Sequence, residues 1–315
     1  MAAWLEERLP QIPRLNLNPT NTRVRHVLNW GGFVNHSFSI EDGSVRYHLK
    51  LTNDLDTEKF RRWHKLHHLL EQRYRAPEVI DWLEFPEIEF AGLLQKHIDG
   101  RTANFRDNRT LLTQLIALLH RLHDDVDLQI QLNTSQSQKT YFDHFVETYI
   151  DRFNADLEAI SKEELPFVSP RLLKCMREEI DRLCIAAVSE QAFHKSAMEP
   201  VHADLHENNV LVTTDSWFVL DWDDLALGDP AIDFAVLVWP IVFESGDWKD
   251  LPLAGTDIEI RKRLNVCFRA QLLDEVIDPL ADYVAAGVVP SKQAEVQLVK
   301  RQQHERALKR YRAAP

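Results

Sequence analysis

Apolar and polar residues alternate with a period of two over residues 24–52. Such alternation is typical of half-buried β-strands, and the Asp42-Gly43 pair in its middle is a strong hairpin signal. Over residues 56–74 the apolar positions instead recur at helical spacing. Two further strand-like segments follow at 78–82 and 91–97. The pattern therefore predicts a small antiparallel sheet with one main helix.

Beyond Gly100 the helical period dominates, and one strand-like stretch at residues 210–220 interrupts it. We therefore predict an α+β chain with two lobes. The first, at residues 1–97, is rich in sheet. The second, at residues 98–315, is larger and mostly helical.

The composition narrows the range of possible functions. A chain of 315 residues with 44% hydrophobic residues can bury a real core. The net charge of −12 argues against nucleic acid as a partner, because phosphate binding needs a basic surface. An acidic surface suits cationic substrates, and it is equally ordinary for a soluble enzyme. No apolar run reaches membrane-spanning length and no signal-peptide pattern is present, so we expect a cytoplasmic protein without a membrane partner.

Two polar clusters flank the predicted hairpin in "VHADLHENNVLVTTDSWFVLDWDD", residues 201–224. If the strands turn around Asp215, Asn209 and Asp221 lie opposite each other. An amide oxygen beside a carboxylate is a typical magnesium environment. Asp204, in the loop before the first strand, is then near enough to act as a base beside the metal. Taken singly, each of these residues is better explained as a turn former.

The first hairpin supports the same interpretation. A turn centred between Asp42 and Gly43 places Lys50 opposite Asn35, directly after "GGFV". A strand lysine beside a glycine-containing turn is well placed to reach phosphates under that turn. The alternative is an edge-strand lysine that prevents aggregation.

Together these residues carry a family resemblance. "HADLHENNVLV" followed by "FVLDWDDLALGDPAIDFA" resembles the catalytic segment of the aminoglycoside phosphotransferase and choline kinase superfamily: His-x-Asp-x-x-x-x-Asn, an apolar strand, an Asp and a Gly-Asp-Pro-x-x-Asp element. The resemblance implies a two-lobe protein-kinase-like fold, in which the lobe at residues 1–97 binds nucleotide and the lobe at residues 98–315 carries the catalytic and substrate-binding residues. It extends from the glycine-containing turn through the catalytic segment, and the chain beyond about residue 240 carries no matching motif.

The resemblance implies roles for the catalytic segment. Asp204 would orient or deprotonate the attacking hydroxyl, Asn209 and Asp221 would hold Mg²⁺, and Asp233 would support the site. These roles fit phosphoryl transfer, in which positioning and charge neutralisation dominate. The family often has Gly where this chain has Ala203, so the loop conformation can differ here.

The resemblance also implies the nucleotide site. Lys50 would contact the phosphates of ATP beneath the turn that contains Gly31, Gly32 and Asn35. Glu58 is the best candidate for the helix glutamate that pairs with Lys50 in the family. A first-turn role that complements the helix dipole explains Glu58 equally well.

We therefore expect an ATP- and Mg²⁺-dependent phosphotransferase acting on a small-molecule hydroxyl. One alternative is a choline- or homoserine-type metabolite kinase rather than an aminoglycoside kinase. Another is a nucleotide-binding pseudokinase that acts as an interaction module. For the acceptor, the basic residues from Lys300 to Arg312 favour an anionic group unless they form a solvated face. Trp239, Phe243 and Trp248 favour a quaternary ammonium unless they pack in the core.

Overall fold

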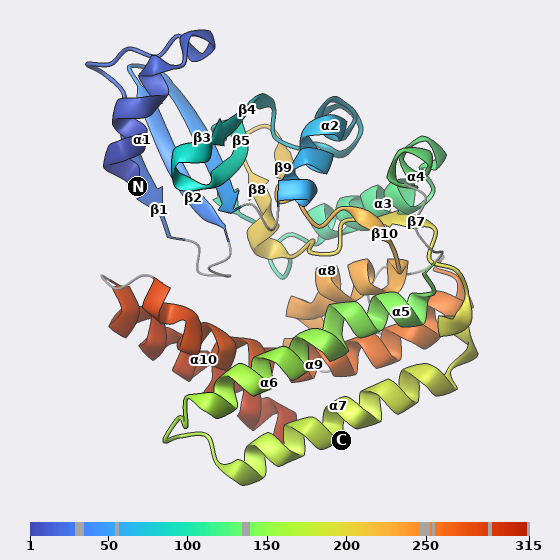
Figure 1. Cartoon of the computed structure of the whole chain (residues 1–315). Helices are drawn as coiled ribbons and strands as arrows, with labels where there is room; N and C mark the ends of the chain where they lie inside the picture. The colour runs from blue at the N-terminus through green and yellow to red at the C-terminus, as the bar shows by residue number, and fades with distance from the viewer. Residues whose placement is uncertain are drawn as a thin grey trace. The chain divides into compact units, whose positions relative to one another are not determined.

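The computed structural model describes residues 1–28, 35–53, 57–133, 139–245, 253, 256–288 and 292–313. The chain forms two compact units, shown in Figure 1. Unit 1 comprises residues 1–103 and 208–224, and unit 2 comprises residues 104–207 and 225–315. Unit 1 is thus built from two separate stretches of chain. The division into functional lobes after residue 97 stays a prediction.

A five-stranded antiparallel sheet organises unit 1, with strand order β1-β2-β3-β5-β4. Apolar side chains on one face, among them Phe38, Ile40 and Leu49, pack with Leu5 of α1 into a core. The elements are β1 (Arg23–Val27), β2 (His36–Asp42), β3 (Val45–Asn53), β4 (Val79–Phe85), β5 (Phe90–Lys96) and α1 (Ala2–Arg8). The predicted small sheet is confirmed.

The main helix of unit 1 is α2 (Thr57–Tyr74). Its buried residues recur three and four positions apart, so one stripe of the helix is apolar and the rest is polar. The buried residues are Phe60, Trp63, Leu66, Leu70 and Tyr74. This helix agrees with the predicted one.

The register of the first hairpin differs from the prediction. Asp42 pairs with Val45, so Gly43 and Ser44 form the two-residue turn. Gly43 takes the left-handed conformation, with φ +62°. The turn centre therefore lies one residue later than predicted, and Lys50 pairs with Ser37. The predicted pairing of Lys50 with Asn35 was wrong.

The second hairpin is also shifted. Strands β8 (Val210–Val212) and β9 (Trp217–Val219) pair Val212 with Trp217, and β6 (Arg101–Thr102) joins β8 on its other side. The turn is closed by a bond from the Thr213 amide to the Ser216 carbonyl, 2.9 Å long. Its centre therefore lies between residues 214 and 215. Asn209 consequently lies opposite Leu220, whose amide donates to the Asn209 carbonyl at 2.8 Å, and the predicted pairing with Asp221 was wrong by one residue.

Unit 2 is mostly helical. The long helix α9 packs against α6, α7, α8 and α10. The helix α8 is apolar almost all round and packs against both α9 and α3, which explains its burial. The helices are α3 (Arg109–His123), α4 (Val126–Leu132), α5 (Tyr141–Phe145), a π-helical turn (Val146–Asp151), α6 (Arg152–Lys162), α7 (Pro170–Ser189), α8 (Pro230–Ser245), α9 (Ile258–Ala285) and α10 (Gln293–Ala313).

One short two-stranded sheet completes unit 2. It pairs β7 (Glu199–Val201) with β10 (Ala226–Gly228). The structure thus confirms the α+β class, with an antiparallel sheet near the N-terminus and a helical C-terminal part. Within the described ranges, no helix combines the length and the apolar character needed to cross a membrane.

Candidate active site

Unit 1 contains a cavity of about 270 Å³ that gathers three of the predicted site residues. Lys50 comes from β3, Asn209 precedes β8, and Asp221 follows β9. The rest of the lining is mixed, with apolar side chains such as Val27, Leu28 and Ile98 and polar ones such as His48 and Gln95. A concave site that combines apolar walls with converging polar groups is typical of a small-molecule site.

Lys50 is held by two carboxylates. Its side chain is 9% exposed, and its ammonium donates to Asp221 Oδ1 and to Asp223 Oδ2, the latter at 3.2 Å. The ammonium also lies over the ring of Phe60, 5.3 Å from the ring centre. Burial acts to lower the pKa of Lys50, but the two carboxylates outweigh burial and raise it. Lys50 is therefore positively charged.

Asp221 and Asp223 form a pair of like charges. Burial raises the pKa of Asp221, and the neighbouring Asp223 adds to this effect, while Lys50 opposes it. Burial also acts to raise the pKa of Asp223, but its hydrogen bonds with Asp221 and Lys50 and the charge of Lys50 outweigh this and lower that pKa. A divalent cation beside the pair would favour the charged form of both carboxylates.

Asn35 lies beside the same carboxylates. Its side-chain amide donates to Asp223 Oδ2 at 3.1 Å. Its Oδ1 atom is buried and accepts no hydrogen bond from the residues that the structure describes. A buried acceptor without a donor is costly, so this oxygen suits a cation or a ligand donor. Sequence reasoning expected Asn35 near Lys50, and the contact instead runs through Asp223.

The structure says less about the other residues that were predicted to bind the nucleotide. Gly31 and Gly32 lie outside the described residues. Glu58 lies in the first turn of α2, where its charge acts on Arg62. The hydrogen bonds described for Lys50 lead to Asp221 and Asp223, so its pairing with Glu58 stays a prediction.

Basic residues connect α2 to the turn after β9. Lys59 donates to Asp224 at 2.7 Å, and Arg62 donates to the Asp223 carbonyl at 3.2 Å. Sequence reasoning missed both. Their signal in the sequence was weak, because exposed basic residues are ordinary on a helix surface.

The loop that carries Asp204 belongs to unit 2 and is fixed by Asp233. The carboxylate of Asp233 accepts from the amides of His202, at 3.0 Å, and Ala203, at 2.7 Å. His123 of α3 bonds the same carboxylate at 2.9 Å, and Asp233 is fully buried in the first turn of α8. Ala203 has a φ of +68°. The predicted support by Asp233 thus has a structural basis, and its partner His123 was missed.

Asp229 is part of a second buried network in unit 2. It bonds the Ala231 amide at 2.8 Å at the start of α8, as a capping residue does. Arg263 of α9 donates to both carboxylate oxygens, at 2.8 and 2.9 Å, and both side chains are almost fully buried. Asp229 therefore both begins α8 and holds Arg263, a partner that sequence reasoning missed.

Two acidic residues of α9 lie in unit 2, and one of them is affected by the charge of Asp204. Asp274 and Asp278 on α9 share Arg152 as a cationic partner, at 2.8 and 3.7 Å. Burial raises the pKa of both carboxyls, that of Asp278 to about 7, and neighbouring carboxylates add to the effect. The Asp204 charge is among those that act on Asp274. This part of unit 2 is therefore rich in carboxyl groups that hold their protons more tightly than exposed ones do.

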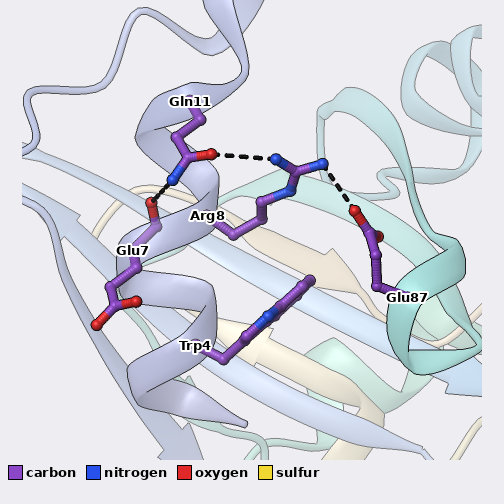
Figure 2. A pocket seen from close by; sticks show the side chains of 5 residues that line it. All are labelled: Trp4, Glu7, Arg8, Gln11 and Glu87. Carbon is purple, nitrogen blue, oxygen red and sulfur yellow. Dashed lines mark hydrogen bonds and ion pairs between the residues drawn. The ribbon is translucent and has the colours of Figure 1, made fainter.

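A second cavity in unit 1, of about 230 Å³, lies between α1 and the turn Pro86–Ile88. Figure 2 shows Arg8 reaching from α1 between Gln11 and Glu87, with bonds of 3.1 and 2.8 Å. These polar groups satisfy one another, so they offer less to a ligand than the Lys50 cavity does.

Comparison with known proteins identifies the family. Residues 27–255 match the model of the phosphotransferase enzyme family. No curated protein sequence matches the chain. Among solved structures, the chain is similar to a choline kinase from Cryptosporidium parvum Iowa II, with 16% identity, a TM-score of 0.58, and coverage of 98% of this chain and 95% of that chain.

Two further solved structures are similar to the chain. An ethanolamine kinase from Plasmodium vivax has 13% identity and a TM-score of 0.54, over 96% of this chain and 86% of that chain. A spectinomycin phosphotransferase in complex with ADP and spectinomycin has 14% identity and a TM-score of 0.59, over 98% and 97%. The chain therefore belongs to the phosphotransferase enzyme family and has the kinase-like fold of choline and aminoglycoside kinases.

Proposed function

We propose that this protein is a kinase that uses ATP and Mg²⁺ to phosphorylate a hydroxyl of a small molecule. The observation that carries the proposal is the single cavity in unit 1 that combines Lys50 with Asn209 and Asp221. Phosphoryl transfer needs a cation that contacts the phosphates, and it needs oxygen ligands that hold a metal ion. Both are needed because the chemistry depends on neutralising phosphate charge.

The residues present fit Mg²⁺. Mg²⁺ prefers oxygen ligands and binds few protein groups, since phosphates and water complete its shell. The cavity offers the Asn209 amide and the Asp221 carboxylate, with Asp223 and the unsatisfied Oδ1 of Asn35 beside Lys50. Asn209 and Asp221 would hold the metal, which when bound would neutralise the phosphate charge.

The cavity also fits a nucleotide. Its apolar side chains can cover a base, and Gln95 contributes a buried side-chain nitrogen that donates to no described residue. Lys50 would exchange its present carboxylate partners for phosphate oxygens, for which a compact ammonium is well suited. Gly31, Gly32, Asn35 and Glu58 complete the proposed nucleotide site.

Asp204 is proposed as the base that orients or deprotonates the acceptor hydroxyl. The role is supported by its place in the His-x-Asp-x-x-x-x-Asn pattern and by family membership. The Asp233 carboxylate fixes the backbone just before it. A rigid loop lowers the cost of orienting a catalytic group.

The charge distribution of unit 2 favours a cationic acceptor. Asp274 and Asp278 share one cationic partner, Arg152, and the charge of Asp204 acts on Asp274, so a cationic acceptor would favour the ionised form of these carboxyls. Two basic residues of α10 are already compensated: Lys300 is buried and bonded to Asp282, and Arg306 is bonded to Glu244. An amine-bearing alcohol therefore fits better than a carboxylate or phosphate acceptor.

The aromatic residues give less support for a quaternary ammonium site. Trp239 is 8% exposed, donates to Glu275 at 2.8 Å, and packs against Phe243 and Phe268. Core packing explains these contacts. Trp248 lies outside the described residues.

The test is ADP release with Mg·ATP across aminoglycosides, choline, ethanolamine, homoserine and amino sugars, paired with calorimetry of Mg·ADP binding. We expect one amine-bearing acceptor to stimulate release. Asp204→Asn should abolish this while leaving Mg·ADP binding intact. Asp215→Asn, in the turn between β8 and β9, is the matched control and should retain activity.

The outcomes separate the alternatives. Mg·ADP binding without stimulation by any acceptor would favour the pseudokinase. Failure to bind Mg·ADP would overturn the proposal, and turnover that survives Asp204→Asn would overturn the role of Asp204.

A further inference from the structure

Three potential metal ligands lie together on α2, apart from the cavity residues. His67, His68 and Glu71 each offer one ligand atom, and these atoms lie within 4.8 Å of one another. The buried stripe of α2 is formed by other residues, so these three side chains are not needed in the core. Their spacing of three and four positions places Glu71 one helical turn from both histidines.

Two of the three side chains are already oriented by hydrogen bonds. The Nδ1 atom of His67 lies 2.5 Å from the carbonyl oxygen of His64, which leaves Nε2 to bind a metal. Glu71 Oε1 accepts from the amide of Val79 at 2.8 Å, which leaves Oε2. Metal-binding histidines and carboxylates are commonly fixed by such outer hydrogen bonds.

Of the three residues, His68 can change its side-chain orientation most easily. Its side chain is 80% exposed, and its Nδ1 atom already lies 3.9 Å from Glu71 Oε2. Ligands bound to Zn²⁺ at about 2.0–2.1 Å in a tetrahedron stand about 3.4 Å apart. The three ligand atoms, all within 4.8 Å of one another, would therefore have to move together by about 1 Å to surround one ion, and the exposed side chain of His68 can supply part of this movement.

We propose that His67, His68 and Glu71 form a binding site for a first-row divalent metal ion, with Zn²⁺ as the best match. Two imidazoles and one carboxylate suit Zn²⁺, whereas Mg²⁺ prefers oxygen ligands only. Three protein ligands leave a position for water. The site is distinct in chemistry from the oxygen ligands Asn209 and Asp221, and it does not depend on the proposed function.

The test is Zn²⁺ titration of the untagged full chain by calorimetry, with excess Mg²⁺ present to compete for sites made of oxygen ligands only. We expect one Zn²⁺ per chain, and we expect Glu71→Gln and His68→Ala each to weaken binding at least tenfold. In Glu71→Gln the side-chain oxygen can still accept from Val79, so folding should be preserved. His194→Ala, which removes an exposed histidine of unit 2, is the matched control and should bind as the parent protein does.

Two further measurements make the result decisive. Zn²⁺ should raise the melting temperature of the parent protein but not that of His68→Ala, because a ligand stabilises only the state that binds it. X-ray absorption at the zinc edge should show nitrogen and oxygen neighbours at about 2.0–2.1 Å. Absence of binding, or equal binding by the parent and both variants, would overturn the proposal.

Discussion

A Cβ atom on Gly92 would lie 1.9 Å from the carbonyl oxygen of Lys50. Gly92 in β5 is next to the pair that Lys50 makes with Leu93. The backbones of β3 and β5 therefore approach each other closely beside Lys50, the residue that is proposed to contact phosphate. Glycine within a strand often marks such a close backbone approach. The position of Lys50 therefore depends on a residue that has no side chain.

Gly92→Ala should lower the free energy of unfolding by about 3 kcal/mol or more, because backbone atoms that cannot rotate away must shift. It should also weaken Mg·ADP binding, since the shift displaces Lys50. Gly287→Ala is the control: the nearest atom to its added Cβ would be 4.0 Å away, on a flexible side chain. Chemical denaturation and calorimetry measure both effects. Equal stability of the two variants would show that β3 and β5 separate at little cost.

Asp221→Asn should weaken Mg²⁺-dependent nucleotide binding at least tenfold, because it removes a carboxylate ligand and a partner of Lys50. Titrating Mg²⁺ at fixed ADP measures the effect. Asp224→Asn changes a neighbouring carboxylate that pairs with Lys59 on the surface, and it should leave the Mg²⁺ dependence unchanged. If Asp221→Asn retains the parent Mg²⁺ dependence, Asp221 is not a metal ligand.

Ala203→Gly should leave the free energy of unfolding unchanged or raise it by up to about 1 kcal/mol. A positive φ costs an alanine about 1–2 kcal/mol, which offsets the extra entropy that glycine gives to the unfolded chain. Ala186→Gly, within α7, has no such compensation and should cost about 1 kcal/mol. Urea denaturation compares them, and an equal loss in both variants would contradict the strain at Ala203.

Loss of the Asp278 proton should lower the free energy of unfolding as pH rises from about 4 to about 7. Its pKa is raised from 3.8 to about 7 in the folded state, so the folded protein binds this proton more tightly than the unfolded chain. The stabilisation is complete below the unfolded pKa and is lost as pH rises through the folded pKa.

The size of this effect is limited by exposure. The side chain of Asp278 is 44% exposed, so solvent screens its neighbours and we expect on the order of 1 kcal/mol. Asp278→Asn should raise stability at pH 8 relative to pH 4 by this amount, compared with the parent. Asp181→Asn, an exposed change on α7, is the control, and melting curves across pH measure the difference. An unchanged pH profile in Asp278→Asn would mean that this carboxyl does not retain its proton.

The sequence by itself determined the type of most elements, and it identified residues that line one cavity. The period of two across residues 24–52 predicted strands, and the helical spacing over residues 56–74 predicted α2. Local periodicity is informative because it reflects which face of an element is buried. The polar clusters around residues 201–224 likewise identified Asn209 and Asp221, which meet Lys50 in one cavity.

Only the tertiary structure decided the exact pairings. Both hairpin registers were wrong because each depends on which residues form the turn, and the errors of one residue and half a residue in the two turn centres changed every partner. The partners Arg263 of Asp229 and His123 of Asp233 are 34 and 110 residues distant in sequence. No local pattern reports such contacts, because they arise when whole helices pack. The close approach at Gly92 likewise follows from the packing of neighbouring strands, which the sequence pattern of one strand does not contain.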